Sequence, residues 1–279
     1  MATIHTKIFS TQHGDLEYYQ VSNPDQDYGI IFIHGLSLNK EWFKEQYLEY
    51  NLNEYSWIVP DLLGHGKSDK PKNQFAYSMI NQAIMLHDLL IEENMSRIVI
   101  FAHSMGGPIA ISLIEEILKT KNQKSINIEV LGLFYLEGNL DKGDAYFSST
   151  IAKYSLNEFE TNFESFLKDL VKKWDSTIEN QRFFERLRSI GPFPLCASCI
   201  DLVYLSNSNN LLPRLQKCLH FPVYFVFGEL NKGLLSSEVL VKEANLPIIY
   251  IPEAGHGLHH GNPSDFWKII KDSISNWKL

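Results

Sequence analysis

The chain contains Arg97-Ile-Val-Ile-Phe-Ala-His-Ser-Met-Gly-Gly-Pro108, an apolar run that leads into a serine and then into small residues. Ser104 lies within Ala-His-Ser-Met-Gly, a near match to Gly-x-Ser-x-Gly with alanine in the first position. In that motif the serine occupies a sharp turn between a strand and a helix, and its hydroxyl projects from the end of a sheet. Ile98–Ala102 accordingly predicts a buried strand, and the residues from Gly106 onward predict a helix. A tight turn whose serine only caps the helix is the alternative.

Strands and helices alternate through most of the remaining sequence. Gly29–His34 is a continuous apolar run, which is typical of a strand buried on both faces of a sheet. Such alternation predicts an α/β fold with a mostly parallel sheet and helices on both faces. The other predicted strands are Leu16–Val21 (with a partner before it), Ser56–Pro60, Val130–Leu136, Val223–Phe227 and Pro247–Ile251, and the other predicted helices are Glu41–Leu52, Ser78–Asn94 and Ser264–Trp277.

The interval from about Leu140 to His220 does not follow this alternation. It is rich in aromatic residues at helical spacing and contains no clear strand. We therefore expect a core domain formed by residues 1–139 and 221–279, with residues 140–220 inserted as a helical cap. The aromatic residues of the insertion include Tyr146, Phe147, Tyr154, Phe159, Phe163, Trp174, Phe183 and Phe184.

The composition excludes several classes of protein. The chain has 279 residues, a formal net charge of -8 and 44% hydrophobic residues, and it has no basic cluster, so nucleic acid is not an expected partner. No apolar run is long enough to cross a bilayer, and the amino terminus lacks the apolar core of a signal peptide. We expect a cytoplasmic protein, and the sequence does not indicate an oligomeric state.

Four motifs follow one another in a specific order: Ile30–Leu36, Asp61–Ser68, Ala102–Gly107 and Glu253–His256. In this order and spacing they resemble the α/β-hydrolase family, and the resemblance covers nearly the whole chain outside the insertion. It implies a serine nucleophile at Ser104, a downstream catalytic histidine, and an insertion that caps the active site.

A serine hydroxyl is a weak nucleophile at neutral pH and requires an adjacent base. His256 is the candidate because it lies in a glycine-containing loop after the last predicted strand, whereas His259 and His260 fall at the start of the next segment. A metal site formed by these histidines is the alternative, but no carboxylate pattern accompanies them. The resemblance further implies that the backbone N–H groups of Leu36 and Met105 form an oxyanion hole.

The triad acid departs from the commonest pattern of the family. The expected position after the seventh strand holds Asn231, which can orient an imidazole but carries no charge. Glu137, at the end of the preceding strand, is the best candidate, because an imidazolium partner would compensate a carboxylate buried there. Glu229 and Asp141 are weaker candidates, and a solvated Glu137 is the alternative. On this hypothesis, Asn231→Ala should change turnover little.

Other residue patterns indicate neither a cofactor nor a metal ion. Cys196-x-x-Cys199 with Cys218 and His220 could form a redox or zinc site, but no thioredoxin-like unit surrounds them. The Asp61–Ser68 loop lacks the lysine placement of a phosphate-binding loop and is interpreted as a structural turn. We assign His103 no catalytic role.

The resulting prediction is a serine hydrolase that cleaves a carboxylic ester through an acyl-enzyme on Ser104, with His256 as base and Glu137 as acid. Its partner would be a small acyl substrate, apolar if the aromatic residues of the cap line a pocket rather than pack the cap. Thioesters, lactones and C–C bonds are alternative substrates, because the same groups serve them all. A ligand-binding protein with little or no turnover, and a lyase, are the remaining alternatives.

Overall fold

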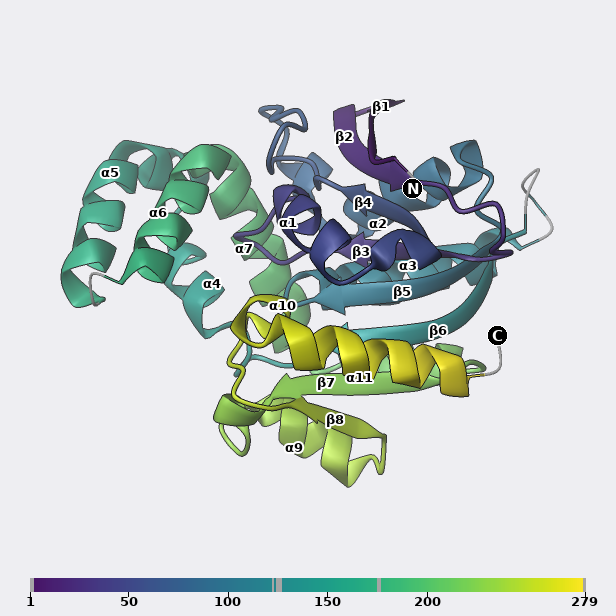
Figure 1. The fold of residues 1–279 in the computed structure, drawn as a ribbon. Helices are drawn as coiled ribbons and strands as arrows, with labels where there is room; N and C mark the ends of the chain where they lie inside the picture. Colours follow the sequence, from purple (N-terminus) through teal and green to yellow (C-terminus); the bar gives the residue numbers. More distant parts are fainter. Residues whose placement is uncertain (1–2, 122, 124–126, 175–176, 278–279) are drawn as a thin grey trace.

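The computed structural model describes residues 3–121, 123, 127–174 and 177–277. Their strands form one sheet in the order β1-β2-β4-β3-β5-β6-β7-β8 (Figure 1). The β1–β2 and β2–β4 pairs are antiparallel, and the pairs from β4–β3 to β7–β8 are parallel. The predicted parallel α/β fold is therefore confirmed. The strands are β1 (His5–Thr11), β2 (Gly14–Val21), β3 (Gly29–Ile33), β4 (Ser56–Pro60), β5 (Arg97–His103), β6 (Glu129–Leu136), β7 (Val223–Gly228) and β8 (Ile248–Ile251).

Helices cover both faces of this sheet and create a separate hydrophobic core on each. On one face, α2 (Met79–Glu92) and α3 (Gly106–Thr120) pack against each other and against the sheet. On the other face, aromatic residues of α1 (Glu41–Glu49) and α11 (Pro263–Asn276) pack against β3 and β5. Because β3 is buried on both faces, its sequence is apolar at every position after Gly29.

The insertion between β6 and β7 is helical in its described residues, and α4–α7 lie beyond the carboxyl ends of the parallel strands in Figure 1. A capping box formed by Ser155 and Glu158 begins α5, and Pro192 begins α7. Residues 175–176 of the predicted cap lie outside the described residues. The helices are α4 (Tyr146–Ile151), α5 (Leu156–Lys173), α6 (Ile178–Ile190), α7 (Pro192–Asn207) and α8 (Leu211–Cys218).

Two local predictions differ from the structure. The helix predicted over Glu41–Leu52 ends at Glu49, because Asn51 adopts a left-handed conformation (φ 53°) and a short 3-10 helix, η1 (Leu52–Glu54), follows. The sequence pattern also gave no separate indication of α7, α9 (Ser236–Glu243) or α10 (Leu258–Gly261). In α7 the buried residues include Cys196, Ala197, Ser198 and Cys199 in succession, so an amphipathic period is absent.

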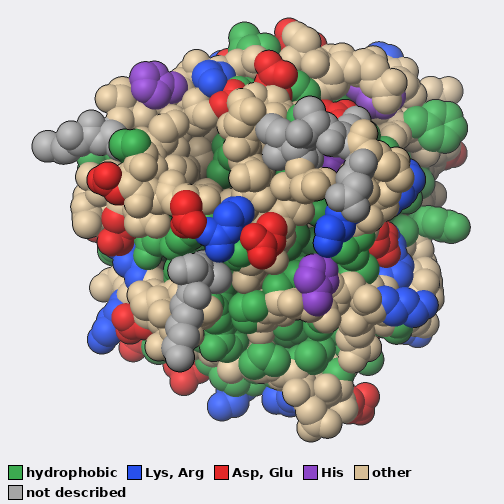
Figure 2. All heavy atoms as spheres, turned by 90° about the vertical axis from the view of Figure 1, so that its right-hand side faces the viewer, with side chains coloured by type: hydrophobic (Ala, Val, Ile, Leu, Met, Phe, Trp, Pro, Cys, Tyr) green, Lys and Arg blue, Asp and Glu red, His purple; other side chains and the backbone are tan. Residues whose placement is uncertain are grey.

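The described residues contain no single helix with the length and apolarity of a membrane span, although the bent pair Asn180–Ile190 and Pro192–Asn207 meets those criteria jointly. Figure 2 shows the end of the molecule at which the parallel strands begin. There, Lys and Arg side chains are interspersed with Asp and Glu. A surface of mixed sign differs from the basic surface of a nucleic-acid-binding protein.

A buried ion pair joins α1 to the loop that follows β4. Lys40 Nζ is fully buried and lies 2.7 Å from Asp61 Oδ2 and 2.8 Å from Glu17 Oε1.

We expect Asp61→Asn to lower the free energy of unfolding by about 3–5 kcal/mol, because it leaves a buried ammonium short of a counter-charge. Urea unfolding measures this, and Glu129→Gln, which breaks a surface contact with Arg97, is the control with an expected loss below about 1 kcal/mol. Equal losses in the two variants would contradict the expectation.

Candidate active site

Ser104 occupies the turn between β5 and α3 in a left-handed conformation (φ 53°). Its N–H donates to Leu136 O at 3.0 Å, and its carbonyl accepts from Gly107 N at 2.9 Å. A Cβ at Gly106 would lie 2.2 Å from Ile33 O, so only glycine fits where α3 begins beside β3. The small residues after the serine are therefore required by the close approach of the backbones.

His256 and Glu137 lie in line with Ser104. His256 Nε2 is 3.1 Å from Ser104 Oγ, and His256 Nδ1 is 2.8 Å from Glu137 Oε2. Because a carboxylate only accepts, Nδ1 carries the proton and donates to Glu137, which leaves Nε2 to accept from the serine hydroxyl. The Glu137 side chain is fully buried, whereas that of His256 is 55% exposed. The structure thus brings together all three residues that the sequence predicted.

Glu137 is held by two further donors. Gly228 N donates to Oε1 at 2.7 Å, and Asn231 Nδ2 lies 3.1 Å from Oε1 and 2.9 Å from Oε2. Asn231 therefore contacts the carboxylate, and the sequence did not predict this contact. Asn231 follows β7, where the family commonly has its acid, and its amide donates to Glu137, which follows the neighbouring strand β6.

The weaker acid candidates lie elsewhere. Glu229 Oε2 accepts from Glu253 N at 3.3 Å, and Asp141 Oδ1 accepts from Ser236 Oγ at 2.6 Å.

His259 and His260 lie in α10, as expected from their position after His256. Both nitrogens of the buried His259 ring lack a hydrogen-bond partner within the described residues.

His103 contacts the backbone of the histidine loop. Its Nε2 lies 2.8 Å from His256 O, and the two rings are 4.8 Å apart between centroids. Burial lowers the pKa of His103 to about 3, so the ring is neutral and its Nε2–H donates to that carbonyl. His103 therefore helps to fix the position of His256.

Leu36 and Met105 follow β3 and Ser104, respectively. In the part of the chain that the structure describes, no hydrogen bond from either N–H to a protein acceptor is formed outside the regular helices and strands. Leu62 N donates to His34 Nε2 at 3.0 Å, so the His34 proton is on Nδ1, which donates to Gly35 O at 2.8 Å. Gly35 O and Leu36 N–H belong to the same peptide unit, and His34 thereby orients this N–H.

The loop after β4 holds the same segment. His65 Nε2 lies 2.8 Å from Leu36 O, and Asp61 accepts from Lys40 N at 2.6 Å. Burial lowers the pKa values of His34 and His65, which keeps both rings neutral. The loop predicted to be a structural turn thus positions the peptide groups at Leu36.

We expect His65→Phe to lower kcat for an ester substrate by about 10- to 100-fold with little change in KM, because a displaced Leu36 N–H weakens only transition-state contacts. His65→Gln retains a donor and should restore most of kcat. Equal kcat values for the Phe and Gln variants, measured on folded proteins, would contradict this role.

The described cysteines are free thiols. Cys196 and Cys199 are buried in α7, and burial raises the pKa of Cys196 to about 11, so this thiol is unreactive at neutral pH.

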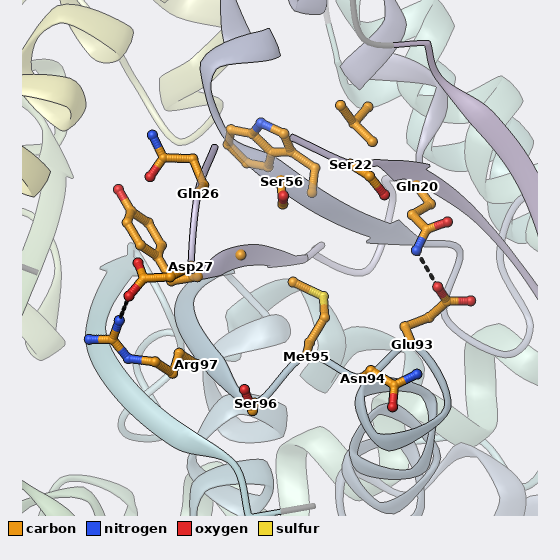
Figure 3. A pocket seen from close by; sticks show the side chains of 14 residues that line it. Gln20, Ser22, Gln26, Asp27, Ser56, Glu93, Asn94, Met95, Ser96 and Arg97 are labelled. Atoms are coloured by element: carbon orange, nitrogen blue, oxygen red, sulfur yellow. Dashed lines mark hydrogen bonds and ion pairs between the residues drawn. The ribbon is translucent and has the colours of Figure 1, made fainter. Parts of the chain in front are cut away.

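A pocket of about 190 Å³ lies at the opposite end of the sheet, where β3, β4 and β5 begin. Figure 3 shows that Arg97 is paired with Asp27 and that the Glu93 carboxylate accepts a hydrogen bond from the Gln20 amide. It contains no serine–histidine pair among its lining residues. The groups suited to nucleophilic chemistry lie instead at the carboxyl ends of the strands.

Residues 29–190 match the sequence model of the alpha/beta hydrolase fold family. An uncharacterized protein of Mycobacterium tuberculosis (strain ATCC 25618 / H37Rv) is 33% identical over 105 residues, which cover 38% of this chain and 29% of that protein. Lipase 1 of Psychrobacter immobilis is 32% identical over 110 residues, which cover 39% of this chain and 34% of the lipase. The chain thus spans about a third of the length of these relatives.

Among solved structures, an esterase from Exiguobacterium antarcticum superimposes with a TM-score of 0.71 over 100% of both chains at 17% identity. At this identity the likeness concerns the fold. Together with the family match, it confirms the resemblance stated from the motifs: this chain belongs to the alpha/beta-hydrolase fold family.

Proposed function

We propose that the protein is a serine hydrolase that cleaves a carboxylic ester through an acyl-enzyme on Ser104. The observation that carries the proposal is the continuous hydrogen-bonded series from Ser104 Oγ through His256 to Glu137, with separations of 3.1 and 2.8 Å. A nucleophile, a base and a group that orients the base are the parts that acyl transfer requires. Relatives named as a lipase and an esterase support the same reaction class.

The reaction begins when His256 Nε2 takes the proton of Ser104 Oγ as that oxygen bonds to the carbonyl carbon. The carbonyl electron pair moves to oxygen, and the imidazolium then gives its proton to the alcohol oxygen as the ester C–O bond breaks. Water, deprotonated by His256, attacks the acyl carbon in the second half. Ser104 leaves with that proton, and the carboxylic acid is released.

Two other parts of the site stabilise the charges that form during the reaction. Glu137 stabilises the imidazolium while it exists, and its burial keeps water from screening the interaction. The N–H groups of Leu36 and Met105 would bind the negative carbonyl oxygen. Each such donor typically lowers the barrier by about 3 kcal/mol.

The helical insertion would act as a cap that selects the substrate. Its aromatic residues contact one another, with Phe183 5.3 Å from Trp174 and 5.5 Å from Phe147 between ring centroids. This favours the interpretation that they pack the cap, so their presence alone does not define an apolar substrate.

Hydrolysis of p-nitrophenyl acetate and p-nitrophenyl butyrate tests the proposal, with Ser104→Ala as the blank. We expect release of p-nitrophenol from both esters that depends on Ser104. Release that is equal in the wild type and in Ser104→Ala would favour a ligand-binding protein instead.

The contact between Asn231 and Glu137 gives a second test of the acid. We expect Asn231→Ala to lower kcat about tenfold, because a hydrogen bond to a charged group contributes about 1.5–3 kcal/mol. The loss should be smaller than that of Glu137→Gln. An unchanged kcat in Asn231→Ala would restore the expectation drawn from the sequence alone.

A further inference from the structure

Two arginines of the insertion have no ion-pair partner among the residues that the structure describes. Arg182 and Arg186 are four residues apart on α6, so their side chains lie on the same face of the helix. Neither forms an ion pair with a described residue, and the buried Arg186 Nε has no hydrogen-bond partner among them. The other arginines are paired: Arg97 with Asp27 and Glu129, Arg188 with Glu164, and Arg214 with Glu115.

The arginine pair acts electrostatically on the turn that follows His256. Desolvation is the largest cause that lowers the pKa of His260 to about 4, and the positive charges of Arg186 and Arg182 contribute to the same shift. The ring of His260 is 4.3 Å from that of His259, which is 5.5 Å from His103. The end of α6 is tied to the core by a hydrogen bond from Lys70 Nζ to Ser189 O.

Among the groups that shift the pKa of Arg186, no negative charge offsets its positive charge. Desolvation and the charge of Arg182 both lower the pKa of Arg186, and no carboxylate contributes to it. Arg182 is exposed, whereas Arg186 is half-buried with an unpartnered Nε, and a partly desolvated cation beside a like charge is unfavourable unless an anion binds it. None of the Asp and Glu side chains that the structure describes pairs with Arg182 or Arg186.

We infer that Arg182 and Arg186 bind a negatively charged group of the substrate, a carboxylate or a phosphate. A guanidinium binds either group through two parallel hydrogen bonds, and a pair of them doubles the charge. The inference rests on the proposed function: the ester carbonyl lies at Ser104, and the anionic end extends beneath α6. The substrate class is thus an ester with an anionic group on its acyl or alcohol part, rather than a wholly apolar ester.

A matched pair of esters tests the inference. Mono-p-nitrophenyl adipate and p-nitrophenyl hexanoate have acyl chains of equal length, and only the former ends in a carboxylate. We expect the ratio of their kcat/KM values, anionic over neutral, to fall about tenfold or more in Arg186→Gln. Arg186→Lys should retain part of the ratio. Arg188→Gln, on the same helix, is the control and should leave the ratio unchanged.

A binding measurement separates this inference from the proposed reaction. Calorimetry with Ser104→Ala protein and either adipate or inorganic phosphate should show binding that Arg182→Gln and Arg186→Gln weaken about tenfold or more. The anion that binds more tightly indicates whether the substrate carries a carboxylate or a phosphate. Arginine-dependent binding without Ser104-dependent turnover would contradict the hydrolase but support the anion site. An unaltered ester ratio, or binding of neither anion, would overturn the inference.

Discussion

Ser104→Ala should lower kcat for p-nitrophenyl acetate by about 10⁴- to 10⁶-fold, the range seen when the nucleophile of such a triad is removed. The reason is that no acyl-enzyme can form, while His256 and the N–H groups of Leu36 and Met105 stay in place. Initial rates at saturating ester, corrected for spontaneous hydrolysis, measure the loss.

Ser198→Ala is the matched control for this substitution. Ser198 is a buried serine of α7 whose hydroxyl lacks a hydrogen-bond partner among the described residues. We expect its removal to change kcat less than about twofold, because it contacts none of the proposed catalytic groups. A comparable loss in both variants would point to damage of the fold rather than of the nucleophile.

Glu137→Gln should lower kcat by about 10⁴-fold, as replacement of the acid by its amide does in serine proteases. The amide retains the shape of the side chain but cannot stabilise the imidazolium. It can also present its N–H₂ group to His256 Nδ1, which then holds its proton on Nε2 and cannot accept from Ser104. Steady-state kinetics with p-nitrophenyl acetate measure this loss.

Glu229→Gln is the control for the acid, because Glu229 lies on the neighbouring turn and its side chain accepts from Glu253 N at 3.3 Å rather than from His256. Its kcat should stay within about twofold of the wild type. If Glu229→Gln lost activity and Glu137→Gln did not, the acid would be misassigned.

The sequence predicted those parts of the site that depend on local pattern. Ser104 is identified by the strand before it and the small residues after it, and His256 by its loop after the last strand. Glu137 could be proposed because a carboxylate at the end of an apolar strand needs a charged partner, and the structure places it beside His256, 119 positions away in sequence.

Contacts that depend on side-chain direction could not be predicted. Asn231 was recognised as a departure from the family, but its donation to Glu137 follows from the position of the turn after β7. Likewise, nothing in the sequence around His65 indicates that its ring reaches Leu36 O. The Nε of Arg186 has no hydrogen-bond partner among the described residues, and this depends on tertiary packing, for which a single sequence has no signal.

The central claim is that Ser104, activated by His256, becomes acylated during turnover. Acid quenching during hydrolysis of p-nitrophenyl acetate, followed by peptide mass spectrometry, tests this claim most directly. We predict that one acetyl group is found on the peptide containing Ser104 and that the modified residue is Ser104 itself. Sustained turnover with no acetyl group on Ser104, or with the acetyl group on another residue, would contradict the account.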